Sequence, residues 1–86
     1  VKALAVNYLI KSEIIVFPNP SNGEFLIETP SQKLQQVEIF SSDGRLVWSE
    51  KFKTKQNSQL IKFNANPGIY FIRINETAWR KIEIAD

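Results

Sequence analysis

The sequence contains no cysteine and no histidine. Without cysteine the chain can form neither a disulfide bond nor a thiolate nucleophile. Without histidine it lacks the commonest general base, a frequent zinc ligand and the base of a serine–histidine–aspartate triad. The sequence therefore predicts a non-catalytic domain with no metal site and no cofactor.

The carboxylates do not form an obvious active site either. A glycosidase needs two carboxylates that face each other across the substrate. Six glutamates are instead spread over different predicted elements, mainly at outward positions, where we expect solvated side chains: Glu24, Glu28, Glu38, Glu50, Glu76 and Glu83.

Long apolar runs and a large excess of charge are also missing. No run approaches the roughly 18 apolar residues that cross a bilayer, and the net charge is only +2. Lys51, Lys53 and Lys55 form the one basic cluster. We interpret them as a charged strand edge that discourages aggregation; the alternative is a patch for an anionic partner. Nucleic acid is not an expected partner, because nucleic-acid binders usually carry a larger basic excess.

Turn signals recur about every ten residues, a spacing typical of a β-sandwich or barrel. They occupy residues 18–23, 29–31, 42–44, 55–58, 66–68 and 75–78. In the first, Pro18 and Pro20 withhold two backbone donors, and Asn22-Gly23 favours positive φ. The last includes a glycosylation sequon, Asn75-Glu76-Thr77, which we interpret as a chance match.

Seven short apolar segments between these turns predict strands over residues 14–17, 24–29, 36–41, 45–53, 59–64, 69–75 and 79–85. No segment sustains a helical stripe beyond two turns. With 86 residues the chain has room for one domain with a modest core. We predict an all-β, seven-stranded antiparallel immunoglobulin-like sandwich over residues 13–86, with an open barrel as the alternative. Residues 1–12 are interpreted as a linker or a loose extra strand.

The aromatic residues divide between a core and a surface. Alternation directs Tyr70 to the core, and we expect Trp48 there too. It directs Phe71 outward, together with Ile69, Phe40 and Trp79. Such a patch marks a docking surface, unless the linker segment or a neighbouring domain covers it. A sugar stacked on Trp48 or Trp79 is a further alternative.

Three segments carry a family resemblance. They are residues 16–25 (VFPNPSNGEF), residues 37–47 (VEIFSSDGRLV) and residues 67–74 (PGIYFIRI), the last followed by Arg80-Lys81-Ile82. In this order and spacing they resemble the type A C-terminal sorting domain of the type IX secretion system of Bacteroidota, from about Glu13 to the end of the chain.

The resemblance implies that this domain is a sorting signal for a larger cargo protein that precedes it in the chain. Such domains fold in the periplasm and are recognised by the outer-membrane translocon and its shuttle protein. A surface sortase then usually removes the domain, so the cargo becomes attached to the cell surface or secreted. The fold implied is a seven-stranded immunoglobulin-like sandwich.

The resemblance also implies recognition residues at the matched positions: Pro18, Asn19, Pro20, Gly23, Asp43, Gly44, Arg45, Gly68, Tyr70, Arg73, Lys81, Ile82 and Ile84. The glycines serve backbone geometry, and the prolines fix the entry to the sandwich. Residues 81–84 fall where the terminal recognition segment would lie. Family members commonly end in a lysine-rich tail, whereas Glu83-Ile84-Ala85-Asp86 is more acidic, which suggests a domain retained in the secretion machinery as an alternative. A structural sandwich module and a strand-exchanged dimer are further possibilities.

Overall fold

The computed structural model describes residues 13–85, and within this range the chain forms seven β-strands and no helix. The strands are β1 (Ile15–Phe17), β2 (Glu24–Glu28), β3 (Leu34–Ser41), β4 (Leu46–Gln56), β5 (Ser58–Lys62), β6 (Gly68–Ile74) and β7 (Ala78–Ile84). Each corresponds to one predicted strand, which confirms the all-β assignment. The predicted linker over residues 1–12 lies outside the described residues.

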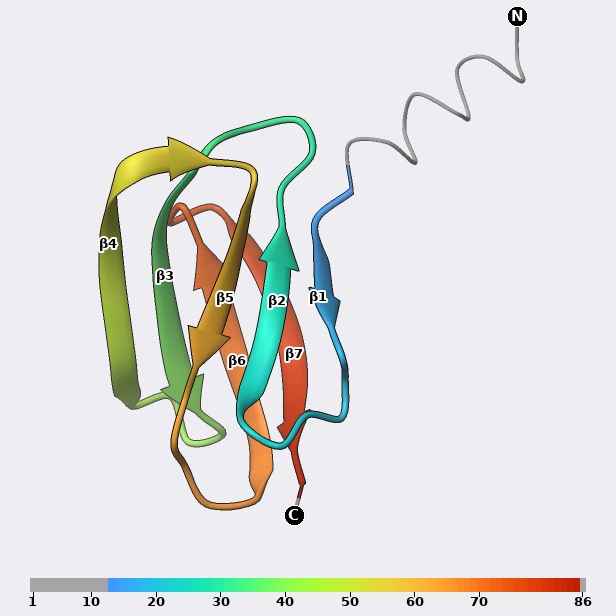
Figure 1. Cartoon of the computed structure of the whole chain (residues 1–86). Coiled ribbons are helices and arrows are strands. Elements are labelled where there is room, and N and C mark those ends of the chain that lie inside the picture. Colours follow the sequence, from blue (N-terminus) through green and yellow to red (C-terminus); the bar gives the residue numbers. More distant parts are fainter. Residues whose placement is uncertain (1–12, 86) are drawn as a thin grey trace, which may run out of the picture.

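The strands form two antiparallel sheets that pack face to face (Figure 1). One sheet has the order β1-β2-β5, and the other has the order β4-β3-β6-β7. Chain neighbours pair within a sheet in β1–β2, β3–β4 and β6–β7, while the other three connections cross between the sheets. This arrangement confirms the predicted sandwich of immunoglobulin-like type over the open barrel.

The core lies between the sheets and is built mainly by alternation along the strands. In β6, Ile72 and Ile74 are fully buried, whereas Ile69 and Phe71 on the opposite face are each 37% exposed. Full burial of an apolar side chain of this size contributes about 1.5–3 kcal/mol. The buried apolar residues come from both sheets: Ile14, Phe25, Ile27, Leu34, Val37, Ile39, Ile61, Phe63, Ile72, Ile74, Ile82 and Ile84.

The connection between β4 and β5 is shorter than the turn predicted over residues 55–58. Strand β4 continues to Gln56, and only Asn57 separates it from β5. The Asn57 side chain donates to the carbonyls of Thr29 (2.8 Å) and Gln32 (2.7 Å), and the backbone carbonyl of Asn57 accepts from the Thr29 N–H (2.7 Å). These bonds satisfy the backbone where the chain changes sheets, so no longer turn is needed.

The two ends of the sandwich carry different segments (Figure 1). The described chain enters β1 at one end, where the connections β2–β3 and β6–β7 also lie. The opposite end gathers residues 18–23, 42–45 and 63–67 with the end of β7. The turns of the three sequence motifs and the end of the terminal strand therefore lie at the end remote from the chain entry.

Candidate functional site

The turn after β1 lies along the free edge of the terminal strand β7. The side chain of Asn19 donates to the carbonyl of Lys81 (3.0 Å) and accepts from the N–H of Glu83 (2.9 Å). One carboxamide thus makes the two bonds that a residue of a neighbouring strand would make. Pro18 and Pro20, which flank Asn19, are exposed, and each follows a cis peptide bond.

Ser21 continues this contact by one further step. Its N–H donates to the carbonyl of Glu83 (2.8 Å), and its carbonyl accepts from the N–H of Ala85 (2.7 Å). This is a parallel bridge to the end of β7. The Ser21 hydroxyl also donates to the carbonyl of Glu24 (2.9 Å) and accepts from the N–H of Gly23 (3.0 Å). Ser21 is 3% exposed and was not among the predicted site residues, because a small polar residue in a turn has no periodicity that would reveal a distant partner.

Arg80 covers the other half of the β7 edge. Its Nη1 donates to the carbonyl of Trp79 (2.7 Å), and its Nε donates to the carbonyl of Ile14 (3.2 Å). Arg80, Asn19 and Ser21 together occupy the edge from Trp79 to Ala85. An edge covered in this way is a poor template for pairing with another strand.

Gly23 places this turn against the end of β5. Its φ is 112°, and a Cβ built at this position would lie 2.8 Å from the carbonyl oxygen of Phe63. The N–H of Phe63 in turn donates to the carbonyl of Gly23 (2.7 Å). The predicted geometric role of Gly23 therefore has a steric cause as well as a conformational one.

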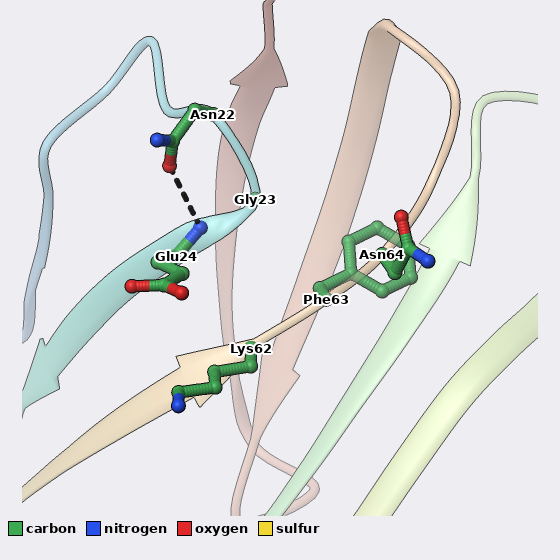
Figure 2. Close-up of a pocket in the computed structure, with 6 residues that line it drawn as sticks. All are labelled: Asn22, Gly23, Glu24, Lys62, Phe63 and Asn64. Carbon is green, nitrogen blue, oxygen red and sulfur yellow. Dashed lines mark hydrogen bonds between the residues drawn. The ribbon is translucent and has the colours of Figure 1, made fainter.

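A shallow cavity of about 240 Å³ adjoins the same turn (Figure 2). Figure 2 shows Asn22 accepting from the N–H of Glu24 at its rim, a bond of 3.2 Å. Glu24 and Lys62 are cross-strand partners beside it. The other lining residues are Gly23, Phe63 and Asn64. Its lining therefore combines both charge signs with two amides.

The second motif forms a tight turn at the same end of the sandwich. Gly44 has a φ of 88° and donates to the carbonyl of Ser41 (2.9 Å), and the Ser41 N–H donates to the carbonyl of Arg45 (2.8 Å). The Ser41 hydroxyl donates to Asp43, and this bond, aided by the Arg45 charge, lowers the pKa of Asp43. The Arg45–Asp43 ion pair is 3.9 Å long between exposed side chains, so it adds little stability.

The third motif begins β6 with Gly68 and places Tyr70 at the rim of the core. The Tyr70 hydroxyl donates to the carbonyl of Asn66 (2.7 Å). Its ring meets Phe63 edge-on, with centroids 5.1 Å apart. Tyr70 therefore holds the loop before β6 against the sandwich, as a half-buried aromatic with a polar tip can.

Arg73 belongs to a different place, the outer face of the four-stranded sheet. It donates two hydrogen bonds to Glu38, from Nε (2.8 Å) and from Nη2 (3.0 Å). Its guanidinium lies 5.3 Å from the Phe40 ring centroid and 5.5 Å from that of Trp79. The Arg73 hydrogen bond lowers the pKa of Glu38, and the same bond raises the pKa of Arg73.

The expectation that Glu38 is solvated is therefore wrong. Glu38 is 8% exposed, because its outward position on β3 lies directly opposite Arg73 on β6. The predicted outward apolar patch is confirmed on this face: Trp79 is 49% exposed, and its ring centroid lies 5.4 Å from that of Phe40. Trp48 packs against the core, as expected.

The three predicted residues of the terminal segment point in two directions. Ile82 is fully buried and Ile84 is 3% exposed, so both side chains belong to the core. Lys81 is exposed on the outer face, opposite Phe71. A partner that binds the folded domain can therefore contact Lys81 but not the side chains of Ile82 and Ile84.

Neither a metal centre nor a membrane helix is found in the part of the chain that the structure describes. Residues 13–85 contain no group of three or more acidic, histidine or cysteine side chains that could hold a metal ion. They also contain no helix long and apolar enough to span a membrane.

Comparison with known proteins identifies one family. A family model described as the secretion system C-terminal sorting domain matches residues 15–84. No curated protein matches the chain significantly. The matched range begins with β1 and ends with β7, so it contains the complete sandwich together with the turn that covers the β7 edge.

Proposed function

The chain belongs to the family of secretion system C-terminal sorting domains, and from this membership we propose that it is a non-catalytic sorting signal recognised by the type IX translocon. The family itself is one of secretion signals, and a type IX signal implies export to the cell surface or secretion. The proposal adds the route: a cargo that precedes the domain, passage through the periplasm, recognition by the translocon with its shuttle protein, and removal by a surface sortase.

The structural observation that supports the proposal is the contact of the first motif turn with the last strand. Asn19 and Ser21 hold the backbone of residues 81–85 in place, at the end remote from the chain entry at Glu13. A cargo attached ahead of Glu13 leaves that end accessible. A sorting signal whose terminal segment is held in place away from the cargo is suited to recognition by a separate protein.

The test is the location of a reporter fused ahead of the whole chain in a type IX-competent host. We expect reporter on the surface, and periplasmic retention would contradict the proposal. Deleting Ile84–Asp86 should abolish delivery, but it also removes a core residue. The double substitution Lys81→Ala and Glu83→Ala is therefore tested beside the deletion. This double substitution changes two exposed side chains and preserves the backbone bonds to Asn19 and Ser21.

Sugar binding is a second candidate, favoured by the 49% exposure of Trp79. An exposed indole can stack on a sugar ring, whereas Trp48 packs against the core. The candidate predicts retarded migration of the purified domain in gels that contain polysaccharide, with normal migration restored by Trp79→Ala. Migration unaffected by polysaccharide would dispose of it.

A further inference from the structure

An uninterrupted row of outward side chains crosses the four-stranded sheet. The pairing registers place Leu46 of β4 beside Phe40 of β3, Phe40 beside Phe71 of β6, and Phe71 beside Lys81 of β7. Leu46 is 50% exposed and Phe71 is 37% exposed. The middle of the row is therefore apolar and open, and its end at β7 is a lysine.

The neighbouring row gives this surface a rigid centre. It runs from Ser49 through Glu38 and Arg73 to Trp79. Arg73 donates two hydrogen bonds to Glu38 and lies near the rings of Phe40 and Trp79. Because the carboxylate neutralises the guanidinium, the centre adds no net charge. Fixed aromatic and arginine side chains lose little conformational freedom on binding, which is why such residues dominate interfaces.

Lysines lie on both margins of this face. Lys81 lies on β7, and Lys51 lies on β4 opposite Gln36, both on the outer side. Lys53 follows on the same side by alternation, since Phe52 between them packs on the core. On β7, Glu83 lies two residues from Lys81 on the same outer side and offsets its charge, so the net positive charge of this face lies along β4.

The outer face of the other sheet has the opposite charge character. Its apolar row is Phe17, Leu26 and Leu60. Beside it lie Glu28 and the cross-strand pair of Glu24 and Lys62, so carboxylates outnumber lysines there. Both faces expose apolar side chains, but they differ in charge. A substitution on the outer face of β1-β2-β5 is therefore a suitable control for the same kind of substitution on the outer face of β4-β3-β6-β7.

We propose that the outer face of β4-β3-β6-β7 is the surface on which a protein of the secretion machinery docks, through an apolar patch bordered by carboxylates. The proposal rests on the proposed function and adds the face that is read. Phe71, Phe40 and Trp79 make the apolar contact, Arg73 holds the two rings in place, and the lysines at the two margins meet the acidic border.

The test compares two matched substitutions in the reporter fusion of the whole chain. Phe71→Glu places a carboxylate opposite Lys81, where an opposite charge is tolerated. Leu60→Glu makes a similar change at a 49% exposed site on the other sheet, two residues from Lys62. Thermal unfolding of both purified domains checks that each remains folded. We expect Phe71→Glu to lower the amount of surface reporter about tenfold or more, as loss of a central aromatic contact does, and Leu60→Glu to leave it unchanged.

A photo-crosslinking phenylalanine analogue at position 71, with position 17 as control, identifies the partner. Crosslinks from position 71 to the translocon or its shuttle protein, absent from position 17, support the proposal. Surface delivery of the folded Phe71→Glu variant at the level of the unchanged chain overturns the docking face and leaves the sorting function intact. Equal loss from both substitutions, or a crosslink from position 71 to a second copy of the chain, also overturns it. Failure of the unchanged chain to reach the surface contradicts the sorting function itself.

Discussion

The carboxamide of Asn19 accepts a hydrogen bond from the backbone N–H of Glu83, 64 residues later in the chain (2.9 Å). The same side chain donates to the carbonyl of Lys81. A residue from the first motif therefore stands in for a neighbouring strand along the last one. This contact connects the Pro-Asn-Pro motif with the terminal segment, which the sequence shows only as two separate features.

Replacing Asn19 by alanine should release the terminal half of β7 without unfolding the sandwich. We expect the free energy of unfolding to fall by about 1–2 kcal/mol, because two hydrogen bonds to the backbone are lost. Chemical denaturation measures this loss, and hydrogen exchange should become faster at the amide of Glu83. Asn64→Ala is the control, because the Asn64 side chain makes no hydrogen bond to another described residue; equal effects of the two substitutions would contradict the role of Asn19.

Gly23 and Gly44 should respond differently to substitution by alanine. Both have positive φ, 112° and 88°, so each substitution strains the backbone. Only at position 23 does the added Cβ also meet a backbone atom, the Phe63 oxygen at 2.8 Å, while at position 44 nothing lies within 4 Å. We expect Gly44→Ala to cost about 1 kcal/mol and Gly23→Ala clearly more. Thermal unfolding of the two variants tests the order, and the reverse order would contradict the steric argument.

The ion pair of Glu38 and Arg73 should make the domain sensitive to acid. The hydrogen bond from Arg73 lowers the pKa of Glu38 below its ordinary value of 4.5. A lowered carboxyl pKa stabilises the fold fully above the ordinary value, and this contribution is lost as the pH falls through the folded-state pKa. Asp43 acts in the same direction.

The Glu38→Gln variant isolates the contribution of this pair. It should be less stable than the unchanged domain at neutral pH, and the difference should shrink as the pH falls below about 4.5. Urea unfolding at several pH values measures the difference. A constant difference across these pH values would show that the charge of Glu38 is not what stabilises the pair.

Alternation along the strands was enough to predict the sandwich. Ile72 and Ile74 are buried, and Phe71 on the opposite face is exposed, because each strand has one face toward the core. The outward patch with Phe40 and Trp79 followed from the same rule.

The contacts of polar side chains could not be predicted in this way. Glu38 occupies an outward position, and only the β3–β6 register brings Arg73 to it. Asn19 and Ser21 bind strand β7 through a turn, where no period relates them to their partners. The change of sheet at Asn57 depends on bonds to the loop after β2. Each of these is a contact between residues distant in sequence, and local propensity does not specify such a contact.

A fourth prediction concerns the structural role of Asn75, which can be tested separately from the glycosylation sequon to which it belongs. Its oxygen accepts from the N–H groups of Gln35 (2.7 Å) and Gln36 (3.1 Å), and its nitrogen donates to Gln32 and Lys33. With a φ of 52° it also adopts a conformation that asparagine tolerates better than most residues. We expect Asn75→Ala to lower the free energy of unfolding by about 2 kcal/mol or more.

Thr77→Ala is the matched control for Asn75. It also destroys the sequon but leaves the bonds of Asn75 in place, so its stability should remain close to that of the unchanged domain. Chemical denaturation of both variants decides the matter. Equal losses would mean that the Asn75 side chain does not fasten the β6–β7 turn to the start of β3.

The most direct test of the central claim is the surface accessibility of a reporter fused ahead of the complete chain. Protease added outside intact cells measures it, in a type IX-competent host and in the same host without its translocon. We expect the reporter to be digested in the competent host and protected in the other. Equal protection in both hosts, or equal digestion in both, would contradict the claim that this domain directs its cargo through the type IX translocon.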